Sequence, residues 1–120
     1  MAESKQAKKN DGRDAKPKLR FLHRELKFGP TRAMMAGEIK YGAWNFLKGH
    51  GLLQLLDAME RHIQAIRDGE WTDPDTTEYL GKEVTHLDCI GANLNMIYWQ
   101  KDNGTLKDDR IYLENKHDKD

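Results

Sequence analysis

Three glutamates placed among apolar residues are the side chains of this sequence best suited to chemistry. Glu83 is predicted close to the centre of the apolar face of a helix over residues 77–99. Glu60 lies on the shoulder of another apolar stripe, and Glu38 points into the middle of a third apolar face. A carboxylate aimed at a core is costly unless it is paired or binds a cation. The pattern therefore raises the possibility of a metal site.

Helix lengths predict that some of these side chains lie at the same level. In an antiparallel hairpin with a rise of ~1.5 Å per residue, Glu60 comes level with Glu83 and His86. Asp57 lies just outside the stripe that carries Glu60. Several inward carboxylates raise one another's pKa, and a divalent cation relieves this. Oxygen-rich ligands with room for water suit Mg²⁺ or Mn²⁺.

A structural interpretation competes with the metal site. A single inward glutamate is more often a satisfied core carboxylate, paired here with Arg61 or Lys40. Because three such glutamates lie on adjacent helices, the residues themselves favour neither the metal site nor the structural interpretation. His62 is interpreted as a packed histidine rather than a ligand, and Cys89 as a small buried hydrophobe.

The loop over residues 42–51 and the methionines before it are also open to two interpretations. The segment Trp44-Asn45-Phe46 either stacks a base or caps the domain, and neither is favoured. Met34 and Met35 are expected in the core.

Three helices are predicted to position these side chains. The first covers residues 30–41, with Pro30 in its first turn and Gly42 after its end, and the second covers residues 52–68. The third covers residues 77–99, where an apolar residue every three or four positions is typical of a helix. The apolar face of the third consists of Tyr79, Leu80, Leu87, Ile90, Leu94, Ile97 and Tyr98. No segment alternates like a strand, so the predicted class is an all-α antiparallel bundle.

Composition bounds the domain organisation and the partners. We expect a disordered arm over residues 1–17, a helical domain over 18–102 and a polar tail over 103–120, in which Ile111, Tyr112 and Leu113 could pack. Lysine plus arginine equals aspartate plus glutamate, at 20 each, so a nucleic-acid partner is not expected. One cysteine, no apolar run long enough for a membrane span and no apolar signal segment predict a cytoplasmic protein.

Two groups of motifs resemble a known family. Asp57-x-x-Glu60, a spacer and Glu83-x-x-His86 resemble the paired acidic signature of the all-α NTP pyrophosphatases, the MazG-like superfamily. The chain is also similar to the phage dATP/dGTP diphosphohydrolase branch, the MazZ-like proteins, in its K-Y-G-x-x-N-aromatic-x-K-G, D-A-x-x-R-H, G-E and H-L motifs. These are matched by Lys40, Tyr41, Gly42, Asn45, Phe46, Lys48, Gly49, Asp57, Ala58, Arg61, His62, Gly69, Glu70, His86, Leu87 and Asn93. His86 replaces the last acidic residue of the signature, and Cys89 stands where the phage branch often has a second histidine.

The resemblance implies an oligomeric helical enzyme, a dimer or tetramer, that uses Mg²⁺ or Mn²⁺. Such an enzyme hydrolyses dATP or dGTP to the monophosphate, releasing pyrophosphate or stepwise phosphate, in phage nucleotide metabolism and hence in the host cytoplasm. The implied catalytic residues are Glu38, Glu60 and Glu83, and the implied metal ligands are Glu38, Asp57, Glu60, Glu83 and His86. The expected substrate-binding residues are Lys40, Tyr41, Trp44, Asn45, Lys48, Arg61 and Asn93. The alternative is a non-enzymatic helical interaction module that kept the fold.

Overall fold

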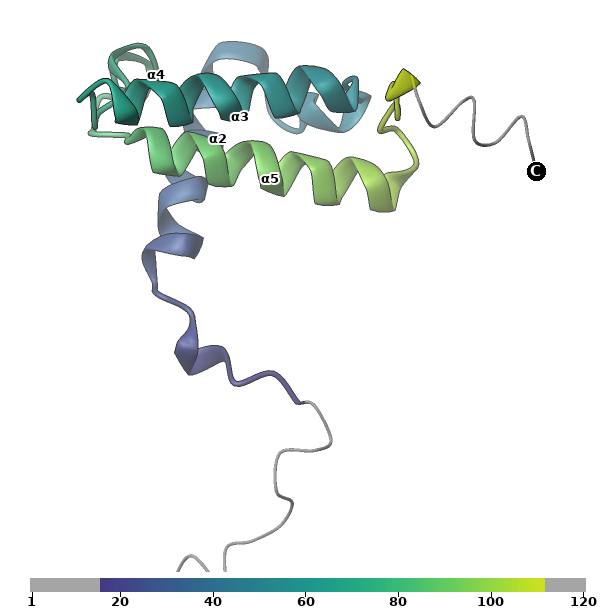
Figure 1. The fold of residues 1–120 in the computed structure, drawn as a ribbon, viewed down its shortest axis with the longest axis horizontal. Helices are drawn as coiled ribbons and strands as arrows, with labels where there is room; N and C mark the ends of the chain where they lie inside the picture. Colours follow the sequence, from purple (N-terminus) through teal and green to yellow (C-terminus); the bar gives the residue numbers. More distant parts are fainter. Residues whose placement is uncertain (1–15, 112–120) are drawn as a thin grey trace, which may run out of the picture.

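The computed structural model describes residues 16–111, and every regular element in that range is helical (Figure 1). The four α-helices are α2 (Glu25–Tyr41), α3 (Leu52–Arg67), α4 (Pro74–Leu80) and α5 (His86–Asn103). Two short 3-10 helices are η1 (Leu19–Phe21) and η2 (Asn45–Lys48). The all-α class is confirmed. The arm expected over residues 1–17 lies, apart from its last two residues, outside the described part of the chain.

The helices α3 and α5 lie side by side and run in opposite directions (Figure 1). The predicted bounds of α3 are confirmed to within one residue, because its apolar spacing is strong and Gly69, at φ 98°, provides a left-handed stop. Leu55 of α3 is only 3% exposed. The helix α5 also packs against α2, and α4 packs against α2, so α5 is the helix at the centre of the fold. No helix within residues 16–111 is long and apolar enough to cross a membrane.

The predicted start of α2 is wrong, because the helix begins at Glu25 and carries Pro30 in its interior. Gly29 and Pro30 lie where α2 crosses α5. A Cβ on Gly29 would come within 2.1 Å of the Asp88 carboxylate, and a Cβ on Gly91 would come within 2.4 Å of Pro30. The two glycines thus permit a close helix crossing. Packing across that crossing outweighs the local preference of Gly-Pro to interrupt a helix.

The single helix predicted over residues 77–99 is wrong as well. The helix α4 ends at Leu80 with Gly81 in the left-handed conformation, and α5 begins at His86. Thr85 caps α5 in a capping box with Asp88, in which each side chain accepts a bond from the other residue's backbone N–H. The apolar spacing continues across this break and conceals it.

The break also changes the buried face, so the predicted apolar face is wrong in part. Its members Tyr79, Leu87, Leu94 and Tyr98 are exposed. The buried side chains of α5 are instead small or polar: His86, Asp88, Cys89, Ala92, Asn93 and Gln100. Glu83 is exposed in the connection between α4 and α5, where it accepts a hydrogen bond from the Thr72 hydroxyl. The expectation that Glu83 lies in a core is therefore wrong.

Residues 105–109 fold over the start of α3. The Lys107 backbone N–H donates to the His50 carbonyl, the Leu52 N–H donates to the Lys107 carbonyl, and the Leu53 N–H donates to the Asp109 carboxylate. The bonds from the Leu52 and Leu53 N–H groups satisfy backbone donors that the first turn of a helix leaves without partners. Ile111 is 73% exposed, and Tyr112 and Leu113 lie outside the described residues.

Candidate active-site cleft

A cleft of about 790 Å³ opens between α2, α3, α4, α5 and the loop that follows α2. All of these elements contribute polar or charged side chains to its wall. Most of the residues expected to bind substrate line it: Lys40, Tyr41, Trp44, Asn45, Arg61 and Asn93. Lys48 is exposed at the end of η2 and is not among the lining residues. Met34 and Met35, expected in the core, line the cleft instead, and Met35 is 50% exposed.

Lys40 brings a positive charge to the cleft. Its ammonium group lies 3.6 Å from the Asp75 carboxylate and about 5 Å from the ring centres of Tyr41 and Tyr79. The hydrogen bond to Tyr41, first, and the charges around the group raise the pKa of Lys40 above its ordinary value. Lys40 is therefore a cation at neutral pH, and Arg61 supplies a second one across the cleft.

Aromatic rings gather where the loop meets α5. The Trp44 ring centre lies 5.9 Å from that of Trp99, edge to face, and 5.7 Å from that of Phe46. Trp44 is 61% exposed and holds a left-handed backbone conformation, with φ 61°. That conformation is strained for a bulky residue, and such strain tends to occur at functional sites. Trp44 thus presents a ring at the cleft that the fold does not bury.

Gln100 holds this loop against α5. Its side chain is fully buried; its amide nitrogen donates to the Phe46 carbonyl at 2.7 Å, and its amide oxygen accepts from the His50 N–H at 2.9 Å. The amide nitrogen also lies 2.8 Å from the His50 ring nitrogen. A buried amide with all of these partners fixes the backbone of the loop.

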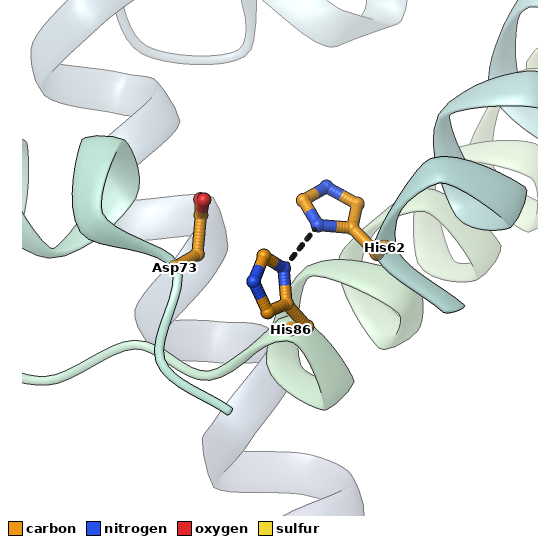
Figure 2. Close-up of side chains that lie close together, drawn as sticks. All are labelled: His62, Asp73 and His86. Carbon is orange, nitrogen blue, oxygen red and sulfur yellow. Dashed lines mark hydrogen bonds between the residues drawn. The ribbon is translucent and has the colours of Figure 1, made fainter. Parts of the chain in front are cut away.

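A second polar group, which we call the histidine corner, consists of His62, Asp73 and His86. His62 comes from α3, Asp73 precedes α4 and His86 opens α5, and the two rings face each other (Figure 2). Their Nδ1 atoms are 2.8 Å apart, and one ligand atom from each of the three residues lies within 4.8 Å of the others. Within residues 16–111 this is the only group of three acidic, histidine or cysteine side chains that could hold a metal ion.

Backbone pairing builds the histidine corner. The Asp73 N–H donates to the Val84 carbonyl, and the His86 N–H donates to the Trp71 carbonyl. These two bonds join the segment before α4 to the segment before α5. Asp73 and His86, which lie 13 residues apart in sequence, are thereby brought to one place.

The surroundings of the corner set the protonation of its members. Burial lowers the pKa of His62, so this imidazole is neutral at neutral pH and keeps a nitrogen lone pair. The Glu70 carboxylate lies 2.8 Å from His86 Nε2. Burial raises the pKa of Cys89 to about 12, so its thiol stays protonated and lies 3.6 Å from Asp73 Oδ2. Cys89 is 5% exposed, which confirms the expectation of a small buried side chain.

The expected carboxylate ligands are spread over several surfaces. Glu38 is exposed on the wall of the main cleft. Asp57 and Glu60 share an exposed face of α3 with Arg61, beside a smaller cleft of about 390 Å³. Glu83 lies in the α4–α5 connection and is not among the residues that line either cleft. The described residues of one chain do not bring these four carboxylates together, and their role as ligands stays a prediction.

Sequence reasoning placed only His86 of the corner in a metal site. His62 was expected to pack, and Asp73 was not singled out. The signal available for Asp73 was an aspartate directly before Pro74, which is typical of a helix start. Glu60 was expected to lie level with His86, and His62 is in the same turn of α3 as Glu60. The hydrogen bond between His62 and His86 agrees with that expectation.

The donor chemistry of the corner suits a divalent cation. Two imidazoles and one carboxylate form a mixed nitrogen and oxygen set, which fits zinc-like ions better than Mg²⁺. The fold and the cleft together define an all-helical protein that presents cations, aromatic rings and side chains able to hold a metal ion around one cleft of about 790 Å³. The chain belongs to the family described as dATP/dGTP diphosphohydrolase, N-terminal, whose family model matches residues 5–110. This match confirms the family resemblance, and its description denotes a hydrolase. No significant match is found to a curated protein or to a solved structure.

Proposed function

We propose that this chain hydrolyses purine deoxynucleoside triphosphates, dATP or dGTP, to the monophosphate in a metal-dependent reaction that releases pyrophosphate. The observation that carries the proposal is the cleft, which gathers cationic, aromatic and amide side chains in about 790 Å³. Small-molecule sites occupy roughly 300–1,000 Å³. The family description supports the same substrates. The resemblance to the phage branch supports a role in phage nucleotide metabolism.

The lining residues suggest how a nucleotide would be oriented. Lys40 and Arg61 would bind the phosphates through charge-assisted hydrogen bonds. Trp44, exposed at the cleft, would stack on the base, and Asn45 would bond to the base or the sugar. The Asn93 amide nitrogen donates to the Cys89 carbonyl at 2.9 Å, so its oxygen remains available to a substrate group.

The catalytic cation is proposed to bind carboxylates beside the phosphates. When bound, a divalent cation neutralises phosphate charge and activates a water molecule. Glu38 is the candidate ligand that lines the cleft itself, and Asp57 and Glu60 flank Arg61 on the adjoining face. Glu83 and His86 complete the proposed set. The role of the chain is to hold these oxygens and nitrogens near the substrate and to fix the position of the phosphates.

Incubation with each dNTP tests the activity directly. The full-length chain is mixed with one dNTP at a time and Mg²⁺ or Mn²⁺, and both pyrophosphate and phosphate are measured. We expect pyrophosphate from dATP or dGTP and none from the pyrimidine nucleotides. Phosphate without pyrophosphate would indicate stepwise cleavage. Failure to consume any dNTP with either metal would contradict the proposal.

The role of the loop is tested by a matched pair of variants. Trp44→Ala and Trp44→Gly both remove the ring, and both should weaken nucleotide binding by the ~1–3 kcal/mol typical of base stacking. Only glycine accepts the left-handed conformation without cost, so Trp44→Gly should be more stable than Trp44→Ala by about 1 kcal/mol. Asn45→Ala should also weaken binding. If all three variants bind dGTP as the parent does, the loop only caps the fold.

A homo-oligomer, dimer or tetramer, is part of the proposal. The start of α2 and the segment before it project away from the α3–α5 pair (Figure 1). This projecting segment carries exposed apolar side chains that include Leu19, Phe21, Leu22, Leu26 and Phe28. An apolar surface of this kind is typical of a protein interface. Light scattering that finds a monomer at micromolar concentration would contradict the oligomer.

The alternative is a helical interaction module without activity, and the dispersed carboxylates favour it. Such a module needs no divalent cation, so removal of metal should leave its melting temperature unchanged. The proposed hydrolase should instead be stabilised by metal through mass action. Melting curves of the parent with and without Mn²⁺ separate the two candidates.

A further inference from the structure

The histidine corner has features of a metal site of its own, apart from the four carboxylates that the proposed hydrolysis uses. Its three members come from three separate segments, and backbone hydrogen bonds hold two of those segments together. His62 and Asp73 also line the main cleft. A site at this corner would therefore have access from the cleft.

Glu70 prepares His86 to act as a ligand. A carboxylate accepts hydrogen bonds, so His86 Nε2 carries the proton that it donates to Glu70 across 2.8 Å. His86 Nδ1 then presents its lone pair toward His62. A metal-binding histidine commonly donates its other ring N–H to a carboxylate, which fixes its tautomer and orientation. This arrangement is already in place at His86.

The two rings are spaced as two ligands of one ion would be. Their Nδ1 atoms lie 2.8 Å apart and share one proton. Two imidazole nitrogens at ~2.0–2.1 Å from one zinc ion lie roughly 3 Å apart. The separation of the two ring nitrogens is therefore close to that of two ligands of one ion, and each ring would turn so that its nitrogen points at the ion.

Asp73 offers one carboxylate oxygen to the ion, because hydrogen bonds already hold its other carboxylate oxygen in place. Its Oδ2 accepts from the Thr76 N–H and hydroxyl and from the Cys89 thiol. All of these bonds go to the same oxygen, so Oδ1 is available to a cation. The carboxylate thus remains fixed at the start of α4 while it offers one ligand atom.

We propose that His62, Asp73 and His86 bind a divalent transition-metal ion of the zinc or cobalt kind, with Glu70 orienting His86. Imidazole ligands favour such ions, whereas Mg²⁺ prefers all-oxygen ligands. Three protein ligands leave at least one coordination position for water or a substrate oxygen. This inference goes beyond the proposed hydrolysis, because it assigns an ion of a different class to His62, Asp73 and His86, with His86 as a ligand of this ion rather than of the catalytic one. It does not require turnover.

Cobalt titration of the full-length chain without an affinity tag tests the site. Co²⁺ bound to nitrogen ligands absorbs visible light, so we expect an absorption band that saturates at one ion per chain. The melting temperature should rise with Co²⁺ concentration by mass action. A parent protein with neither a band nor a melting shift up to millimolar Co²⁺ would overturn the proposal.

Substitutions locate the ion. His62→Gln removes a ligand from a half-buried position, and Asp73→Asn keeps the helix cap while removing the charge. Each should weaken Co²⁺ binding at least about tenfold, and Glu70→Gln should have a smaller effect of the same sign. His23→Gln, at an exposed histidine away from the corner, should bind as the parent does. Parent-like binding by both His62→Gln and Asp73→Asn would overturn the assignment, as would equal loss in His23→Gln.

Two further measurements define the metal class and separate this inference from the proposed function. A large excess of Mg²⁺ should not displace Co²⁺, and displacement at similar concentrations would overturn the zinc-like class. Hydrolysis of dNTPs is measured on the same samples. Co²⁺ binding without hydrolysis would support the corner and contradict the hydrolase, and hydrolysis with no Co²⁺ binding would do the reverse.

Discussion

The histidine corner and the carboxylates differ in how the chain places them. The corner is assembled from three segments, is buried or half-buried, and has its ligand atoms within 4.8 Å. Glu38, Asp57, Glu60 and Glu83 are all exposed, and only Asp57 and Glu60 share a surface. Contacts between distant segments bring the first group together, whereas helical spacing and a family resemblance suggested the second. Spacing within one helix therefore identifies a face but does not bring side chains from different helices to one point.

The largest expected effect is on pyrophosphate release, and it distinguishes the carboxylates from the histidine corner. Glu38→Gln keeps the shape of the side chain but removes the charge from the cleft wall. Pyrophosphate release should fall at least about 100-fold, because a metal ion contributes several kcal/mol to the transition state and about 1.4 kcal/mol corresponds to tenfold. The cobalt band of the corner should remain. Parent activity in the Glu38→Gln variant would show that Glu38 on the cleft wall is not a ligand of the catalytic metal.

A second change disturbs the helix crossing that supports the corner. Gly91→Ala places a Cβ 2.4 Å from Pro30, whose ring cannot rotate away. Overpacking of this kind costs about 1–3 kcal/mol of the free energy of unfolding, measured by urea denaturation. The matched control is Gly37→Ala on α2, where a Cβ meets no atom within 4 Å. That control should be stabilising by roughly 0.5–1 kcal/mol, because alanine is the better helix former. Equal effects at both glycines would contradict the close crossing.

A third change distinguishes the structural role of Asp73 from its proposed ligand role. Asp73→Ala removes the cap of α4 and should cost about 1 kcal/mol of unfolding free energy. Asparagine caps a helix about as well as aspartate, so Asp73→Asn should stay within a few tenths of a kcal/mol. Thermal or urea unfolding of both variants measures the difference. If Asp73→Asn is as unstable as Asp73→Ala, the charge itself is needed for folding.

The smallest effect concerns Glu83. Because Glu83 is exposed and bonded to Thr72, Glu83→Gln should change the metal-free unfolding free energy by no more than about 0.5 kcal/mol. A buried charge would respond much more strongly to the same substitution. A shift above ~1 kcal/mol in urea would contradict the exposed position. Pyrophosphate release by this variant tests its proposed ligand role separately.

The parts of the fold that were predictable are those set by local signals. The bounds of α3 follow from a regular apolar stripe and a terminal glycine, and the loop after α2 follows from its glycines. The break before α5 had a local signal too, in Gly81 and in the Thr85-x-x-Asp88 capping box. It was missed because the apolar spacing runs through it without a change of period.

Other features depended on contacts that no local pattern encodes. Pro30 is accommodated inside α2 because Gly91 of α5 lies against it. Asp73 meets His86 because backbone bonds join residues 71–73 to residues 84–86. The residues expected to bind substrate do come together, since Lys40, Trp44, Asn45 and Arg61 line one cleft, and their role in binding stays a prediction. Their resemblance to a family supplied information about the assembled site that helical spacing lacks.

The buried Gln100 has a consequence for how this cleft could diversify. Two of its three bonds to the loop are made with main-chain atoms, at Phe46 and His50. The path of the loop is therefore maintained from α5 and does not require the side chains of Trp44 or Asn45. Substitutions at those two positions can accumulate over generations while the frame beneath them stays constant. If Trp44 and Asn45 contact the base as proposed, natural selection can alter base preference separately from foldability.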